Sequence, residues 1–349
     1  MNRDEILHKI ATNQTIQGLD LTGIDLSGAD LTGGRFENVI FQGADLRNVN
    51  ILRTGIKKCD FSGANLEGTD LTKVDLRKMR FTGASMKGVK LHQTLLQHAD
   101  LSETDFSGTL FSWTLLQHAN LERANLSDTR FEKVICNHAS MKGVDLRNSD
   151  LLKAVFRDCD LEEARFDGCH MFKVFLGGCN LAGQNFKGVK FSTVNAAEAN
   201  LQGADFEGTD IAFSSFMGAD LTKANMTGVH GGNVMFKDAI LHETILKKAQ
   251  IEQSYFGGAD LALVDFSGAN LTHCVFTGAS MKGCKCKDAN LSYADFCYAD
   301  LSGSDFTRAN LTMARMHKTV EDATTWTGAV KFPIRGEDKE MTEAEEWPM

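Results

Sequence analysis

Large apolar residues recur at every fifth position along most of this chain. Between Ile16 and Met316 there are 61 such central positions, and 57 of them hold Leu, Ile, Phe or Met. The exceptions are Cys136, Ala196, Gly231 and Cys286. Two residues before each central position lies a small position, where 55 of 61 residues are Ala, Cys, Ser, Thr or Val. A period of five fits neither a helix nor a strand, so the pattern predicts a repeating supersecondary unit.

The repeated unit is a small residue, Asp or Asn, a large apolar residue, a polar residue and often Gly. Clear copies begin at Ala29, Ala64 and Ala204. Over residues 16–316 this unit resembles the pentapeptide repeat family. The resemblance implies an all-β fold, a right-handed quadrilateral β-helix in which four pentapeptides make one coil. We therefore expect about 15 coils and a stack roughly 70 Å long at the usual strand spacing.

Residues twenty positions apart should then be vertical neighbours inside the stack. Five Phe residues and three further Phe residues share two such inner lines. They are Phe216, Phe236, Phe256, Phe276 and Phe296 on one line, and Phe166, Phe186 and Phe206 on the other. Stacked identical aromatics are typical of in-register coils, so we predict core ladders of rings and no cofactor cage.

The ends of the chain depart from the repeat and divide it into three parts. Residues 1–15 predict a short amphipathic cap helix, because a bare first coil would leave an open sheet edge. Residues 16–316 are the repeat, and residues 317–349 form a C-terminal cap and an acidic tail. We expect the tail to be solvated from Glu337 to Glu346. Four apolar residues could fold over the last coil: Trp326, Val330, Phe332 and Ile334.

Two central positions inside the repeat are too small for the pattern. They are Ala196 and Gly231. Glycine in a strand usually marks such an irregularity, and we favour a local bend or thin packing at both positions. The alternative is a hinge or a docking notch.

The nine cysteines predict a packing role. Cysteine fills narrow cores as a small apolar residue, and we favour this over disulfides or metal ligation. Cys159 and Cys179 are vertical neighbours, but their side chains should run parallel, which suits bridging poorly. Six occupy small positions (Cys59, Cys159, Cys169, Cys179, Cys274 and Cys284), Cys136 and Cys286 occupy central positions, and Cys297 alone is predicted to face outward.

Composition excludes several functions. A net charge of −9 and a pI of about 5.6 argue against direct nucleic-acid binding. There is no apolar run long enough to span a bilayer and no secretory leader, so we expect a cytoplasmic protein, with leaderless secretion left open. No catalytic motif occurs, and a filled core offers no pocket. We expect no enzyme activity, no cofactor and no metal.

One outward column breaks the repeat's rule. The pre-central position, directly before each central residue, is mostly Asp or Asn, yet here it is apolar. Contiguous exposed apolar surface usually marks an interaction site, so the column is a candidate partner or dimer face. Packing of these side chains against each other is the alternative, and the sequence leaves both open. The residues are Leu95, Leu115, Ile135, Val155, Phe175, Met235, Tyr255 and Val275.

Beside this column lie three histidines twenty apart, His98, His118 and His138, with Gln97, Gln117 and Asn137 next to them. Stacked rings that point the same way close no metal shell, so we predict a polar ladder. A cationic column of Arg53, Lys73, Lys133, Lys153 and Lys173, with Trp113 and Phe213, is expected to be a solvated edge. The Asp columns are expected to bond their own turns.

The family resemblance frames two functional hypotheses. The first is a non-catalytic, rod-shaped scaffold or adaptor of bacterial type, with secretion-associated proteins as one option, that binds a protein partner or forms a homodimer through an end or the apolar face. The second is a DNA mimic that binds DNA gyrase or another topoisomerase and modulates sensitivity to quinolones or toxins. Neither hypothesis involves direct nucleic-acid or membrane binding.

Overall fold

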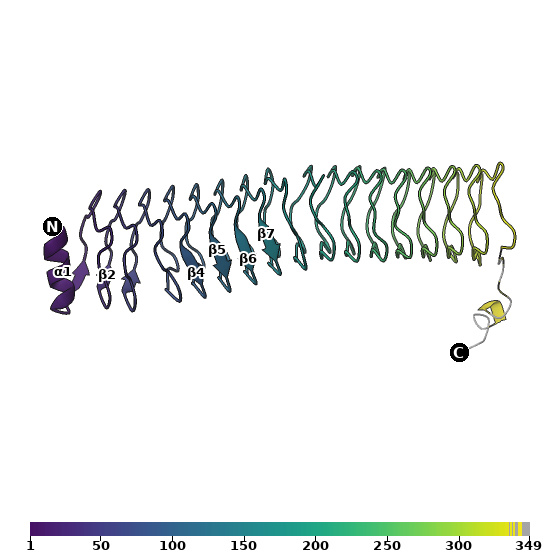
Figure 1. The fold of residues 1–349 in the computed structure, drawn as a ribbon. Coiled ribbons are helices and arrows are strands. Elements are labelled where there is room, and N and C mark those ends of the chain that lie inside the picture. The colour runs from purple at the N-terminus through teal and green to yellow at the C-terminus, as the bar shows by residue number, and fades with distance from the viewer. Residues whose placement is uncertain (335, 337, 339–340, 344–349) are drawn as a thin grey trace. The chain divides into compact units, whose positions relative to one another are not determined.

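The computed structural model describes residues 1–334, 336, 338 and 341–343. The chain divides into two compact units, Met1–Asn180 and Leu181–Met349. Within each unit, successive coils lie in parallel on one another (Figure 1). This arrangement confirms the right-handed quadrilateral β-helix expected from the repeat. Within the described part of the chain, every helix falls short of the length and apolarity that a bilayer crossing requires.

Helix α1 (Arg3–Ala11) begins the first unit. Asn2 caps it, because its side chain accepts a hydrogen bond from the Glu5 N–H at 2.9 Å while the Glu5 carboxylate accepts one from the Asn2 N–H at 3.0 Å. Ile6 is fully buried, and the helix contacts strand β1 (Thr15–Gln17). The helix therefore covers the first strand, which would otherwise be an open edge.

The bridges of the ladder join residues that are twenty positions apart. In β1, Ile16 lies opposite Phe36 of the next strand, and other paired residues follow the same spacing. The side chains of central and small positions therefore stack inside each unit. The strands β1, β2 (Arg35–Glu37) and β3 (Gly55–Lys57) form one parallel sheet, and β4 (Lys90–His92), β5 (Leu110–Ser112), β6 (Arg130–Glu132) and β7 (Asp150–Leu152) form another.

The second unit contains the predicted Phe ladder. The rings of Phe216, Phe236, Phe256, Phe276 and Phe296 stack with centroid distances of 4.7 to 5.3 Å. All five rings are fully buried, so they form core. On the other predicted line, the rings of Phe186 and Phe206 stack at 4.7 Å, and Phe166 is buried in the first unit.

Close packing accounts for the two undersized central positions. A Cβ atom added to Gly231 would lie 2.6 Å from the backbone nitrogen of Ala212, so only glycine fits there. Beside Ala196, the rings of Phe191 and Phe216 stack at 5.9 Å. At Gly231 the packing is therefore close, whereas thin packing was one of the two expectations.

All nine cysteines are buried and free. At the small positions, thiols donate to a carbonyl of the neighbouring coil, as Cys169 does to Leu146 at 2.7 Å. Burial raises the pKa of the Cys169 thiol to about 12. The expectation that Cys297 faces outward is wrong, because it is only 2% exposed. Its neighbour one coil on, His317, is also buried, and the backbone N–H of Asp338 returns to bond the His317 ring.

The ladder continues past the last central residue that obeys the apolar rule. Asn310 pairs with Val330, and Trp326 stacks on Phe306 at 4.6 Å. Phe332, expected to fold over the last coil, is 84% exposed and does not do so. Instead, the backbone carbonyl of the next residue, Pro333, accepts a hydrogen bond from the Met313 N–H. Much of the acidic stretch from 337 to 346 lies outside the described residues.

Candidate interaction surface

The apolar column of the first unit comprises Leu95, Leu115, Ile135, Val155 and Phe175. Successive members pair through backbone bridges, so their side chains lie above one another. The first four are half-buried, and Phe175 is 36% exposed. The column is therefore continuous and partly open to solvent. It is less exposed than its outward position in the repeat suggested, because the neighbouring members cover one another.

An amide column, Gln97, Gln117 and Asn137, lies two residues further along each coil. The side-chain oxygens of all three are buried and accept no hydrogen bond within the described structure. Buried polar atoms in proteins usually have a partner. These amide side chains would therefore have to turn outward before their oxygens could accept a hydrogen bond from another molecule.

The imidazole ladder, His98, His118 and His138, completes this face. Each histidine has a φ near 60°, at the turn position that Gly occupies in many other coils. The rings stack with centroid distances of 4.9 and 5.1 Å, as predicted for a polar ladder. The carboxylate of Asp158 lies 3.7 Å from Nδ1 of His138 and ends the ladder. Sequence reasoning missed Asp158, although its place twenty residues after His138 could have revealed it.

The second unit has its own apolar residues at pre-central positions. Met235 pairs with Tyr255, which pairs with Val275, and Met235 is 38% exposed while the other two are half-buried. Ile240 and Ile245, on the two following faces of the same coil, are also exposed. Sequence reasoning missed these two isoleucines. Both occupy pre-central positions, which hold Asp or Asn in most repeats, so their apolar character could have identified them from the sequence.

The cationic column is partly engaged with aromatic rings. The Lys133 ammonium lies 4.0 Å above the centre of the Trp113 ring, and Trp113 is about half exposed. Lys173 lies 5.2 Å from the ring centre of Phe172. Such cation–π contacts contribute about 0.5–1 kcal/mol when exposed, so they modestly order this edge.

The Asp columns bond their own turns, as predicted. In Asp100, Oδ1 accepts the backbone N–H of Ser102, and many other Asp residues at this position do the same with the residue two places on. Many also pair with cations, such as Asp105 with Lys87 at 3.1 Å. Partial burial alone would raise the pKa of Asp105, but hydrogen bonds from Ser107 and the nearby Lys87 hold that pKa below its usual value. Much of the acidic charge is therefore engaged within the protein.

The described residues contain no group of three or more His, Cys, Asp or Glu side chains that could hold a metal ion. One enclosed interior cavity, in the first unit, measures about 30 Å³ and is lined mainly by apolar side chains. Ligand sites are usually ten times larger or more, at about 300–1,000 Å³. This interior cavity is therefore too small to be a ligand site.

Comparison with known families agrees with this geometry. The profile described as "Pentapeptide repeats (8 copies)" matches residues 17–51, 139–178, 176–211, 214–250, 244–283 and 284–320. A second profile, "Pentapeptide repeat region", matches residues 54–131. The chain belongs to the pentapeptide repeat family. The matches lie within the five-residue pattern and leave out α1.

Solved pentapeptide repeat proteins are among the structures to which this chain is similar. A protein from the cyanobacterium Cyanothece 51142 is 20% identical over 33% of this chain and 89% of its own, with a TM-score of 0.31. HetL from Nostoc sp. strain PCC 7120, involved in heterocyst differentiation regulation, is 24% identical over 74% and 89%, with a TM-score of 0.22. QnrB1, a plasmid-mediated fluoroquinolone resistance protein, is 16% identical over 81% and 99%, also with a TM-score of 0.22. Comparison with curated proteins gives no match.

Proposed function

We propose that this protein is a non-catalytic scaffold that binds a protein partner through one face of its first unit. The observation that carries the proposal is the alignment of three columns on that face. In three successive coils, an apolar, an amide and an imidazole side chain surround one buried central residue. The central residues are Leu96, Leu116 and Cys136.

The columns of this face make different contributions to the free energy of binding. Half-buried apolar side chains gain about 25 cal/mol for each Å² of apolar surface that a partner covers. The amide side chains are half-buried, and after turning outward they can exchange hydrogen bonds with a partner. The backbone beneath is held by ladder bonds such as Leu96 N–H to the Leu115 carbonyl at 2.8 Å. The face is therefore preorganised, which lowers the entropic cost of association.

The alternative, a DNA mimic that binds a topoisomerase, draws less support from the geometry. Such a role needs negative charge directed outward, whereas Asp60, Asp145 and Asp265 are paired with Arg80, Arg147 and Lys247 of this chain. A gyrase supercoiling assay with and without a quinolone tests it. Inhibition or protection at micromolar protein would favour the mimic over the scaffold.

The scaffold proposal is tested with two variants of equal added charge. The first, Leu115→Asp with Ile135→Asp, places carboxylates in the apolar column. The control, Asn120→Asp with Ser140→Asp, places them at half-buried pre-central positions on the next face of the same coils. Affinity purification from cells of the native host should recover a partner with the wild type and the control, and lose it with the first variant.

Sedimentation of the purified proteins separates a heterologous partner from a second copy of this chain. If the wild type is a dimer and only the apolar-column variant is a monomer, the face is a homodimer interface. Equal recovery of the same partners by both variants, with both folded by circular dichroism, would refute this face as the binding surface.

A further inference from the structure

The first unit contains one place where the coils separate. We call it the open junction; it comprises residues 50–58 and 70–78 of two successive coils. All of these residues are described, yet no bridge joins Asn50 to Asp70 or Gly55 to Asp75. Backbone hydrogen bonds between the two coils are also missing here. The N–H groups that donate no such bond are those of Ile51, Arg53, Ile56, Lys58, Asp70 and Asp75.

The coils remain joined on their other two faces. Leu46 N–H bonds the Asn65 carbonyl at 2.7 Å before the junction, and Phe61 N–H bonds the Arg80 carbonyl at 2.7 Å after it. One coil further on, the ladder is again complete on the same faces, since Leu76 N–H bonds the Leu95 carbonyl at 2.8 Å. The opening is therefore a wedge between two coils, confined to two adjacent faces.

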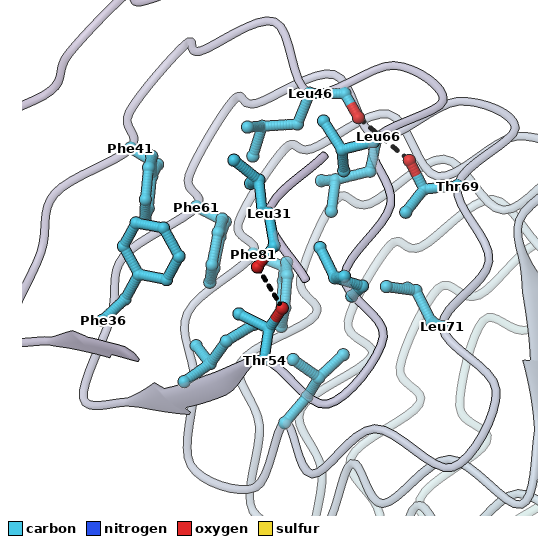
Figure 2. A pocket seen from close by; sticks show the side chains of 14 residues that line it. Leu31, Phe36, Phe41, Leu46, Thr54, Phe61, Leu66, Thr69, Leu71 and Phe81 are labelled. Carbon is cyan, nitrogen blue, oxygen red and sulfur yellow. Dashed lines mark hydrogen bonds between the residues drawn. The ribbon is translucent and has the colours of Figure 1, made fainter. Parts of the chain in front are cut away.

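The core is partly exposed at this wedge. Thr54, Ile56 and Val74 occupy interior positions but are half-buried, whereas Thr94 and Leu96 in the next coils are fully buried. Ile56 lines both the interior cavity of about 30 Å³ and a surface groove of about 650 Å³. Figure 2 shows the apolar side chains around that cavity, with the Thr54 hydroxyl donating to the Leu31 carbonyl and the Thr69 hydroxyl to that of Leu46.

Met79 lies at one end of the wedge. It stands at a small position, where all but six of the 61 residues are small, and its Sδ accepts the backbone N–H of Cys59 at 3.3 Å. Its side chain thus occupies space between the two coils, where a shorter residue would let them approach. The two coils also differ in backbone conformation at this place. Strand β3 is extended, whereas the residues one coil later form a tight turn in which the Met79 N–H donates to the Leu76 carbonyl at 3.3 Å.

Two surface grooves of about 750 and 650 Å³ follow the wedge, one on each face. Six cations and only two carboxylates line them, in a chain whose net charge is −9. Arg77 pairs with Asp75 at 2.6 Å, and Lys90 lies 3.6 Å from Asp70. The remaining cations form no ion pair among the described residues. They are Arg53, Lys57, Lys58, Lys73 and Lys78.

We infer that the open junction binds an extended, acidic segment of another protein. Its backbone pairs with the free N–H and C=O groups of both coils, as in strand addition to a sheet edge. Its carboxylates face Arg53, Lys57, Lys73 and Lys78, and an apolar side chain covers Ile56. Positive charge within a negative protein selects an acidic segment, while the free backbone groups favour a peptide over a nucleic acid.

The test uses a fluorescein-labelled peptide of alternating Glu and Val, about nine residues long to match the junction at strand spacing. Fluorescence anisotropy with the full chain should show saturable binding that weakens with salt. An alternating Glu and Pro peptide has the same charge and lacks half of the backbone donors, so it should bind at least about tenfold more weakly. An oligothymidine of equal charge is the third probe.

Two variants test whether the peptide binds at the open junction. Met79→Ala removes the wedge and should reduce binding of the Glu-Val peptide by at least about tenfold, with the thermal midpoint unchanged or higher. Lys57→Glu with Lys78→Glu should reduce it similarly, whereas the control Lys133→Glu with Lys153→Glu, on the same unit, should not. If Met79→Ala fails to fold, the charge variants decide alone.

Several results would overturn the inference. They are no binding of the Glu-Val peptide, equal binding of the Glu-Pro peptide or oligothymidine, and equal loss in the lysine control. The groove of about 650 Å³ also has Gln97 and His98 of the proposed scaffold face in its lining. Leu115 and Ile135 do not line it, so Leu115→Asp with Ile135→Asp should leave peptide binding unchanged, and this variant separates the two proposals.

Discussion

The open junction and the coils that follow it obey the same sequence rule and differ in structure. We call residues 90–138 the closed stack. Ile51, Ile56 and Leu96 are all apolar at central positions, yet Leu96 is fully buried while Ile56 is partly exposed. In the closed stack the ladder is continuous, as in the bond from Leu116 N–H to the Ile135 carbonyl at 2.7 Å. The central residues thus define the coil, but they do not ensure that two coils close on each other.

The difference lies at the small positions. In the closed stack these hold Thr94, Ala99 and Thr114, and the threonine hydroxyls donate to carbonyls of the neighbouring coil, as Thr94 does to Leu71. At the junction, Met79 brings a long side chain to such a position. Because each coil of a solenoid contacts only its neighbours, one misfit can open a single interface without disturbing the rest.

The largest expected effect comes from removing a core ring of the closed stack. Phe131 is fully buried and stacks on Phe111 at 4.8 Å, so Phe131→Ala should lower the free energy of unfolding by about 3–5 kcal/mol. Ile56→Ala, at the open junction, should cost less than about 2 kcal/mol because its side chain is already partly solvated. Urea denaturation of both variants measures the difference. Equal losses would show that the junction is as well packed as the stack.

The next comparison uses two methionines. Met141 is a fully buried central residue, and Met141→Ala should cost about 2–5 kcal/mol through the cavity it leaves. Met79→Ala restores the small residue of the repeat and allows ladder bonds worth about 1 kcal/mol each to form. Its stability should therefore be unchanged or higher. A loss comparable to that of Met141→Ala would mean that Met79 is ordinary core.

Particular residues show how much of this structure the sequence could predict. The five-residue period predicted the coil, the Phe ladder through Phe256 and the imidazole ladder, because residues twenty apart must stack. It could not reveal the junction, since Ile51 and Ile56 satisfy the pattern. Met79 was the one local signal there. Cys297 was misplaced because its neighbour one coil on, the buried His317, lies beyond the last central residue of the repeat.

Acid should destabilise the coils that follow the open junction more than the junction itself, through their carboxylates. Burial alone would raise the pKa of Asp145, but hydrogen bonds from Arg147 and the charges of Arg147 and Arg165 hold it below its usual value. A lowered pKa in the folded state contributes stability above the unfolded value of about 3.9, and this is lost as the pH falls through the folded value.

The corresponding experiment compares two variants between pH 7 and pH 3. Asp145→Asn should lose about 1 kcal/mol at neutral pH and less below about pH 4. Asp75, whose pKa is lowered by its hydrogen bond to Arg77, is about half exposed, so Asp75→Asn should show a smaller change. Thermal midpoints across this range measure both. A pH-independent effect of Asp145→Asn would contradict the assignment.

The smallest expected difference concerns thiol reactivity. Cys59 borders the junction and Cys136 lies in the closed stack, and burial raises the pKa of both thiols. Local opening should be easier beside the wedge, so Cys59 should be alkylated faster by iodoacetamide in the native protein. Mass spectrometry of timed digests gives the order. Faster modification of Cys136 would contradict a weakened interface at the junction.

The most direct test of the central claim is amide hydrogen exchange of the free protein, resolved to single residues. The account predicts rapid exchange for Ile51, Arg53, Ile56 and Lys58, and strong protection for Leu71, Lys73, Leu76 and Lys78, which hold equivalent places one coil later. Equal protection of the two sets would contradict it, because the coils would then be joined where the structure shows them apart.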